Sequence, residues 1–394
     1  MYLLIPGLKL YEVAEQAKEI PDNSLVGNIT EIFSLVNDFF GSEISEFNLY
    51  QEKGEITFPS LWTLFPPGCE VVQSTLMTEP QALEFSAGSY HNTPHGQHYN
   101  VRARMINYDG QDFGWGDLNI VIPYFDGTKP ITSLPAYPLK FHKNEREVRR
   151  VMIERGKQYI KLCQPICMEY DGMAVEMQYN GFQSRERRFN SIGRVMIDPA
   201  TFRFNQPDNE LSEPKVVVKR PVEQLTEREL LFCNHRVLGF NFGTKKWAAF
   251  AVANLYEVAW DDAAMAKLII EERQRHLITS LITSHPIKEG GFNDVVKGKG
   301  KGLVGLLSGP PGTGKTLTAE AIAEHSKRPL YVVTAGELGT DAEKLDRKLG
   351  DTLSTVHRWG CVLLIDEADT FLRKRADGQI KQNALVNVFL RRLE

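Results

Sequence analysis

The chain has 394 residues, a formal net charge of −4 and a sequence pI near 6.2. This length predicts two or three domains with ample material for packed cores. The slightly acidic balance excludes a global basic field, so nucleic acid is not an expected partner. The sequence holds no run of about 18 apolar residues, and a membrane span is therefore not expected.

The N-terminus and the cysteine usage favour an intracellular location. Residues 1–10 begin with apolar side chains but lack a basic region and a cleavage site, so a secretory signal is not expected. The five cysteines are few and odd in number, which suits a reducing compartment. We expect a cytoplasmic or nuclear protein.

The first part of the chain is expected to be helical and then β-rich. An apolar stripe from Ile29 to Phe40 predicts a helical lead-in over residues 1–48. Apolar segments punctuated by glycine and proline turns predict a β-rich N-terminal domain over residues 49–218. This domain is expected to contain a basic amphipathic helix at residues 142–162. Its strands are expected at residues 56–58, 69–73, 99–107, 118–123, 174–179 and 193–197.

Residues 219–285 are predicted to connect this domain to a C-terminal module. Thr226 is a natural start for a short helix, and glycine at 243 suits a hairpin turn. The connector is therefore expected to hold that helix, a hairpin of strands 237–242 and 247–252, and a second helix over residues 262–284.

Two polar clusters in the β-rich region allow more than one interpretation. His91, His95 and His98 have a metal-like spacing, but no nearby cysteine or acid completes the set, so a loop without a metal is favoured. The arginine-rich segment 185–188 lies beside two phenylalanines and could contact RNA. A solvated strand edge is the favoured interpretation of that segment.

The most informative motif lies near the C-terminus. Residues 309–316 match the phosphate-loop pattern, in which a glycine-rich turn precedes a lysine and a threonine. An apolar run at 303–307 predicts a buried parallel strand before the loop, and an alanine-rich segment at 316–325 predicts a helix after it. The loop consists of Gly309, Pro310, Pro311, Gly312, Thr313, Gly314, Lys315 and Thr316.

These residue types suit a polyphosphate ligand. Glycines let backbone N–H groups approach the phosphates, and the start of the following helix adds a partial positive charge. Lys315 is expected to lie between the β- and γ-phosphates as a point charge. The hydroxyl of Thr316 is expected to ligate Mg²⁺, which prefers oxygen ligands.

A second motif follows about fifty residues later. Residues 362–367 form an apolar run that ends in two carboxylates, Asp366 and Glu367. We expect Asp366 to hold Mg²⁺ through water and Glu367 to polarise an attacking water. The simpler alternative is a strand followed by a helix cap, provided by Asp366 or Asp369.

Together these motifs resemble those of the AAA+ ATPases, over residues 286–394. The flanking segments at 297–302, 317–321 and 335–340 look like a fungal group in which an AAA module follows a long uncharacterised N-terminal region. The resemblance implies a P-loop NTPase fold, with a partial parallel sheet and helices on both faces, and it implies that ATP and Mg²⁺ are bound.

The resemblance also assigns roles to individual residues. Catalysis would fall to Glu367 and Lys315, and the metal to Thr316 and Asp366. The nucleotide would contact Gly309, Pro310, Pro311, Gly312, Thr313, Gly314, Lys315, Thr316, Leu317 and Asp366. Ring assembly into a homo-oligomer and mechanical work on a macromolecule are further properties that the family implies for a complete version.

The sequence departs from this family in two ways. It stops at Glu394, after the helix that follows the second motif, where the family continues with a sensor strand, an arginine finger and a helical lid. We therefore expect a truncated module, a missing neighbour between strands 303–307 and 362–366, and almost no hydrolysis by the chain itself. The connection before Asp341 holds no aromatic residue of the kind that threads peptides, and Thr340 is expected to cap the next helix with Glu343.

Two functions are compatible with these features. The first is an ATPase whose N-terminal region recognises a macromolecular partner. The second is a non-catalytic nucleotide-binding or interaction protein with an incomplete ATPase module.

Overall fold

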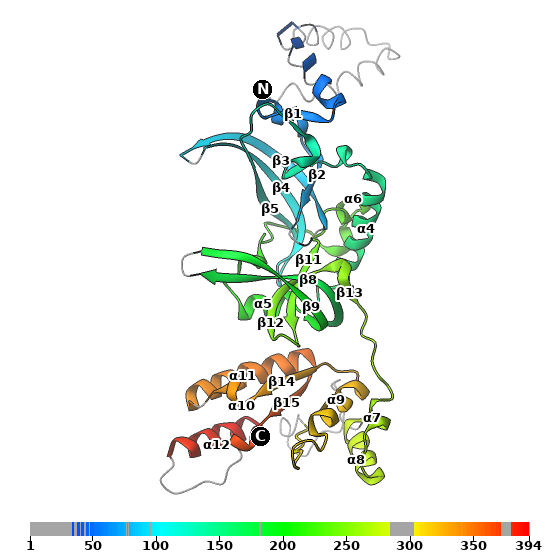
Figure 1. Ribbon diagram of the computed structural model, residues 1–394, viewed down its shortest axis with the longest axis vertical. Helices are drawn as coiled ribbons and strands as arrows, with labels where there is room; N and C mark the ends of the chain where they lie inside the picture. The colour runs from blue at the N-terminus through cyan, green and yellow to red at the C-terminus, as the bar shows by residue number, and fades with distance from the viewer. Residues whose placement is uncertain are drawn as a thin grey trace. The chain divides into compact units, whose positions relative to one another are not determined.

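The computed structural model describes residues 48–75, 77, 79–94, 96–180, 183–283, 303–339, 341–371 and 380–393, with isolated residues between 34 and 46 (Figure 1). The chain divides into two compact units that alternate along the sequence. The first comprises residues 1–163, 208–237 and 251–253, and the second comprises residues 164–207, 238–250 and 254–394. The predicted helix at 1–48 lies largely outside the described residues.

The first unit is built on a six-stranded antiparallel sheet. Its strand order is β10-β5-β4-β3-β2-β7, and long curved strands form its centre (Figure 1). The bounds are β2 Glu70–Ser74, β3 Pro80–Thr93, β4 Gly96–Tyr108, β5 Phe113–Pro123, β7 Ala136–Pro138 and β10 Val218–Lys219. A separate two-stranded sheet pairs β1, Glu55–Thr57, with β6, Thr128–Pro130.

The strand β3 was not predicted from the sequence. Small and polar residues interrupt its apolar pattern, so no period of two is visible. The structure shows why a small residue suits this strand: a Cβ atom on Gly88 would lie 1.9 Å from the hydroxyl of Tyr99 on the neighbouring strand. The strand thus depends on a cross-strand contact that composition does not reveal.

Helix α4, Glu145–Lys161, confirms the predicted amphipathic helix and packs against α6, Glu227–Leu230. The hydroxyl of Tyr159 on its buried face donates to Asn107 Oδ1 at 3.0 Å and accepts from the backbone N–H of Tyr108 at 2.8 Å. Burial raises the pKa of Tyr159 well above its usual value. Together these contacts fix α4 to the sheet.

The second unit begins with a five-stranded sheet of order β12-β11-β9-β8-β13. Because β12 pairs with β8 as well as with β11, four of these strands form a closed circuit. The bounds are β8 Ile166–Asn180, β9 Gln183–Ile197, β11 Arg236–Asn241, β12 Lys246–Ala251 and β13 Leu255–Tyr256. Asp198 then caps the short helix α5, Pro199–Asn205, by accepting from the backbone N–H of Thr201.

The C-terminal part of this unit is an α/β module. Strands β14 and β15 are parallel, in register from the pair Leu330↔Val362 to the pair Thr334↔Asp366. Helices α11 and α12 lie side by side (Figure 1). Its core is formed by apolar residues of these elements, including Val333, Leu345, Leu349, Phe371 and Phe389. The bounds are α7 Ala264–Lys267, α8 Glu272–Thr283, α9 Lys315–His325, β14 Leu330–Thr334, α10 Ala335–Leu338, α11 Ala342–Trp359, β15 Val362–Asp366 and α12 Ile380–Leu393.

The structure corrects several predictions. The segment 303–307 is not a buried strand: all five residues are exposed and outside regular structure. An apolar run becomes a strand only when a neighbour supplies hydrogen bonds, and among the described strands none pairs with it. The expected gap or non-native pairing between strands 303–307 and 362–366 stays a prediction, because the first of these segments is not a strand. The helix predicted at 262–284 is two helices, α7 and α8.

The cap of α11 also differs from the prediction. Asp341, not Thr340, is the N-cap residue, and its carboxylate accepts from the backbone N–H of Lys344 at 3.0 Å. Thr340 itself lies outside the described residues. Adjacent threonine and aspartate are both good capping residues, so the sequence leaves a one-residue ambiguity.

In the part of the chain that the structure describes, no helix is both long and apolar enough to cross a membrane.

The contact between α4 and α6 gives a test of the first unit. A glycine within a helix is normally replaced by alanine with a gain in stability. At Gly156, however, the new Cβ atom would lie 2.1 Å from the carbonyl oxygen of Leu230, which is rigid backbone. We expect Gly156→Ala to lower the free energy of unfolding by about 1–3 kcal/mol, measured by thermal denaturation. Gly336→Ala, where the nearest atom would be 4.0 Å away, should be neutral or stabilising.

Candidate functional site

The phosphate loop is shaped by two glycines with positive φ. Gly312 has a φ of 82° and Gly314 a φ of 81°. Residues with a Cβ atom rarely adopt this left-handed backbone conformation. The hydroxyl of Thr313 donates to the carbonyl of Pro310 at 2.9 Å and closes the turn. The chain then enters α9 with Gly314 as its N-cap residue, which provides no side chain to cover the first N–H groups.

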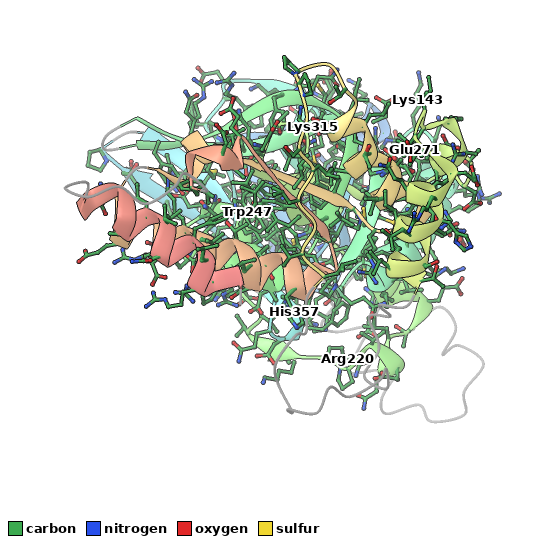
Figure 2. All side chains as sticks on the ribbon, turned by 90° about the horizontal axis from the view of Figure 1, so that it is seen from below. Lys143, Arg220, Trp247, Glu271, Lys315 and His357 are labelled. Carbon is green, nitrogen blue, oxygen red and sulfur yellow. The ribbon has the colours of Figure 1, made fainter. Side chains whose placement is uncertain are left out.

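Lys315 lies at the start of α9 (Figure 2), and its amine closes over the loop. Its Nζ atom donates to the carbonyls of Gly309 and Pro310, both at 2.9 Å. The loop is thus wrapped around the amine of its own lysine. An anion within the loop would compete with these two carbonyls for the amine, and a charged acceptor forms the stronger hydrogen bond.

The two predicted acids lie together at the end of β15. Asp366 is the last residue of that strand, and both it and Glu367 are exposed. Glu367 has a φ of 57°, one of three described non-glycine residues with positive φ. The Asp366 Oδ1 atom accepts from the backbone N–H of Glu367 at 2.9 Å. Asp369 lies in a 3-10 turn, Ala368–Thr370, and Glu367 is the N-cap residue of that turn, without a side-chain capping bond.

The two motifs belong to one packed module. Helix α9, which begins at Lys315, contacts both β14 and β15. The parallel register places Thr334 directly opposite Asp366. In parallel α/β sheets, ligands bind beyond the carboxyl ends of the strands, which is where Asp366 lies.

One structured element beside these acids was not predicted from the sequence. Thr334 and Glu337 form a reciprocal capping box that starts α10. The Glu337 Oε2 atom accepts from the backbone N–H of Thr334 at 3.0 Å, while the Thr334 hydroxyl accepts from the backbone N–H of Glu337 at 3.3 Å. The spacing of threonine and glutamate was a readable signal for this box.

The structure explains the histidine cluster and the arginine-rich segment of the β-rich region. His91 and His98 are cross-strand partners on β3 and β4, and their rings stack with centroids 5.3 Å apart. Thus they lie on a hairpin rather than in a loop, while His95 is outside the described residues. Among the described residues, no group of three or more histidine, cysteine, aspartate or glutamate side chains could hold a metal ion. The Arg187 Nε atom lies 3.8 Å from Glu176 Oε1 on the neighbouring strand β8, as suits a solvated strand surface.

Comparisons with known proteins identify the C-terminal module. Residues 305–394 match the family model described as the ATPase family associated with various cellular activities (AAA). Residues 46–143, which include most of the first sheet, match a domain of unknown function (DUF7025). No solved structure matches the chain.

Curated relatives match the chain over a limited length. A bovine ATPase family AAA domain-containing protein 3 is 45% identical over 92 residues, which are 22% of this chain and 16% of that protein. The human protein 3C of the same name series is 45% identical over 92 residues, covering 22% of each. A Drosophila melanogaster 3A homolog is 41% identical over 128 residues, 31% of this chain and 19% of that protein.

The match is therefore local. The chain spans only 14% to 22% of the length of the first eight curated relatives. Within that span, the family model and the relatives agree: the C-terminal part of this chain is similar to an AAA module, and this similarity implies the fold of a P-loop NTPase.

Proposed function

We propose that the C-terminal module binds ATP with Mg²⁺ and hydrolyses it. The observation that carries this proposal is the conformation of the phosphate loop. Two left-handed glycines present its backbone, and the lysine amine lies against the loop at the start of α9. Backbone N–H groups and a lysine at a helix start are the donors that a polyphosphate requires.

Each residue of this site has a proposed role that follows from its side-chain chemistry. Lys315 would exchange its two carbonyl partners for phosphate oxygens. Thr316 and Asp366 would supply oxygen atoms for Mg²⁺, directly or through water, and bound Mg²⁺ would neutralise charge on the phosphates. Glu367 would accept a proton from the attacking water. The remaining loop residues from Gly309 to Gly314, together with Leu317, would enclose the nucleotide.

The other parts of the chain are proposed to provide recognition and assembly. AAA modules often act as oligomers, and we propose that this module assembles into a homo-oligomeric ring. We propose that the N-terminal region, whose six-stranded sheet belongs to a separate compact unit, contacts a macromolecular partner.

One observation favours a second candidate, a nucleotide-binding or interaction protein that does not hydrolyse ATP. The segment 303–307, which leads into the phosphate loop, is exposed and has no strand partner among the described residues. A loop without that support on one side could bind a nucleotide and still fail to align it for hydrolysis. Binding and turnover must therefore be measured separately.

Nucleotide binding is tested by removing the lysine amine. We expect Lys315→Ala to abolish detectable binding of a fluorescent ATP analogue with Mg²⁺, because the β- and γ-phosphates lose their point charge. Lys344→Ala, at an exposed position on α11, is the matched control and should bind like the unaltered protein. Equal affinity in all three proteins would refute the assignment of the phosphate loop.

The backbone of the loop can be tested without changing any charge. We expect Gly314→Ala to weaken binding of the same analogue about tenfold, because a Cβ atom disfavours the left-handed conformation by roughly 1–2 kcal/mol. Gly305→Ala introduces the same methyl group where no atom lies within 4 Å and should leave binding unchanged. Unaltered affinity of Gly314→Ala would show that this conformation is not needed.

Turnover is tested at the second acid. Glu367→Gln should keep nucleotide binding but release phosphate about 10²–10⁴-fold more slowly than the unaltered protein. An amide cannot act as a base toward water. Glu320→Gln, exposed on α9, should leave the rate unchanged. Undiminished phosphate release by Glu367→Gln would remove Glu367 from the mechanism.

A further inference from the structure

The second unit contains an aromatic cluster that joins its β-sheet to its α/β module. Phe240 on β11 stacks on Tyr331 of β14, with ring centroids 5.5 Å apart and planes 10° from parallel. Trp247 on β12, labelled in Figure 2, meets Trp359 at the end of α11 with centroids 5.8 Å apart. Phe242 also contacts both Tyr331 and Trp359. Aromatic side chains bury large apolar areas, so this cluster is a substantial attachment.

A buried carboxylate lies beside the cluster. The side chain of Asp198, between β9 and α5, is 1% exposed. Its Oδ2 atom accepts from the indole N–H of Trp359 at 2.9 Å and from the Nε–H of Arg358 at 3.0 Å. The same carboxylate accepts from the backbone N–H and the hydroxyl of Thr201. A buried charge is tolerated only when it is paired and hydrogen-bonded, and two of these four donors come from the α/β module.

Ion pairs flank the cluster at two further points. Arg194 on β9 contacts Glu324 near the end of α9, with Nη1 and Oε1 2.6 Å apart. Lys245, in the turn between β11 and β12, donates to both Glu337 oxygens at 2.6 and 2.7 Å. This hydrogen bond from Lys245 is the main cause of a lowered Glu337 pKa, against a smaller opposing effect of burial.

We propose that the sheet of strands β8, β9, β11, β12 and β13 is a fixed part of the nucleotide-binding module, and that Asp198 is the positioning residue that holds it there. The partner of this sheet surface is the edge formed by β14 and the end of α11 in the same chain. The aromatic cluster supplies buried apolar area, and the Asp198 hydrogen bonds fix the register of the two surfaces.

The contact reaches the elements that carry the proposed site. Arg194 holds the far end of α9, the helix that begins at Lys315. Lys245 holds Glu337, whose capping box includes Thr334, the register partner of Asp366. The attachment itself does not rest on the proposed ATPase function, so it can be tested without nucleotide, and its failure would leave that function untouched.

Hydrogen exchange of the full chain, without nucleotide, tests the attachment from the sheet side. Asp198→Asn replaces an acceptor with a group that also presents N–H donors to Trp359 and Arg358. We expect amides in β14 and in the last turns of α11 to exchange roughly tenfold faster, the size expected when a hydrogen bond to a buried charged group is lost. Asp208→Asn, at an exposed aspartate, should leave these amides unchanged.

The reciprocal variant tests the attachment from the module side. Trp359→Phe keeps an aromatic ring but removes the N–H that meets Asp198, so amides at residues 194–202 should exchange faster. Trp62→Phe, in the first unit, is the matched control. Faster exchange across the contact in both variants supports the proposal. Changes confined to 193–205 in Asp198→Asn, and to α11 in Trp359→Phe, would overturn it.

A third variant guards against misfolding at the buried aspartate. Lys245→Ala alters a side chain that is one-third exposed and leaves Asp198 in place. Faster exchange at residues 334–338 is expected, because Glu337 loses its ion pair with Lys245. The capping box with Thr334 then remains as a contact of the Glu337 carboxylate. Unchanged exchange there in Lys245→Ala, with unchanged exchange at 194–202 in Trp359→Phe, would overturn the proposal even if Asp198→Asn does not fold.

Discussion

The charge of a polyphosphate sets the main requirement that the proposed nucleotide site has to meet. Several negative charges must be met at short range by donors that do not need to move. The loop at 309–316 can meet them because left-handed Gly312 and Gly314 turn its backbone, and because Lys315 opens a helix whose first N–H groups are uncovered. The proposed chemistry of the module that matches the AAA family depends on that short segment.

The phosphate loop belongs to the second compact unit, which also contains a five-stranded β-sheet. The second unit contains both a β-sheet and the α/β module, and buried contacts at Asp198 and Trp359 join the two. By contrast, the six-stranded sheet of the first unit belongs to a separate compact unit. The first unit is therefore the part of the chain to which we assign contact with a partner.

Local patterns explain which features the sequence could predict. The phosphate loop, the apolar run before Asp366 and the amphipathic helix α4 are each encoded in consecutive residues, and the structure has a loop, a strand and a helix there. The start of α9 at Lys315 differs by one residue from the expectation. The capping box of Thr334 and Glu337 was equally local and could have been found.

Features that depend on distant residues could not be predicted. Strand β3 has no clear alternation, and its fit depends on Tyr99 lying against Gly88. The segment 303–307 is apolar enough for a strand, but composition does not reveal whether a neighbour is available. The hydrogen bond from the indole N–H of Trp359 to Asp198 joins residues 161 positions apart, and nothing in either local sequence predicts it.

In the proposed site, a bound nucleotide places its phosphates beside Lys315. An acyl-phosphate derivative of ATP transfers its acyl group to a lysine amine that lies next to the bound phosphates, and mass spectrometry then identifies the modified residue. We expect labelling concentrated at Lys315 and suppressed by excess ATP with Mg²⁺. Labelling spread over exposed lysines such as Lys344, without protection by ATP, would contradict this placement of the phosphates.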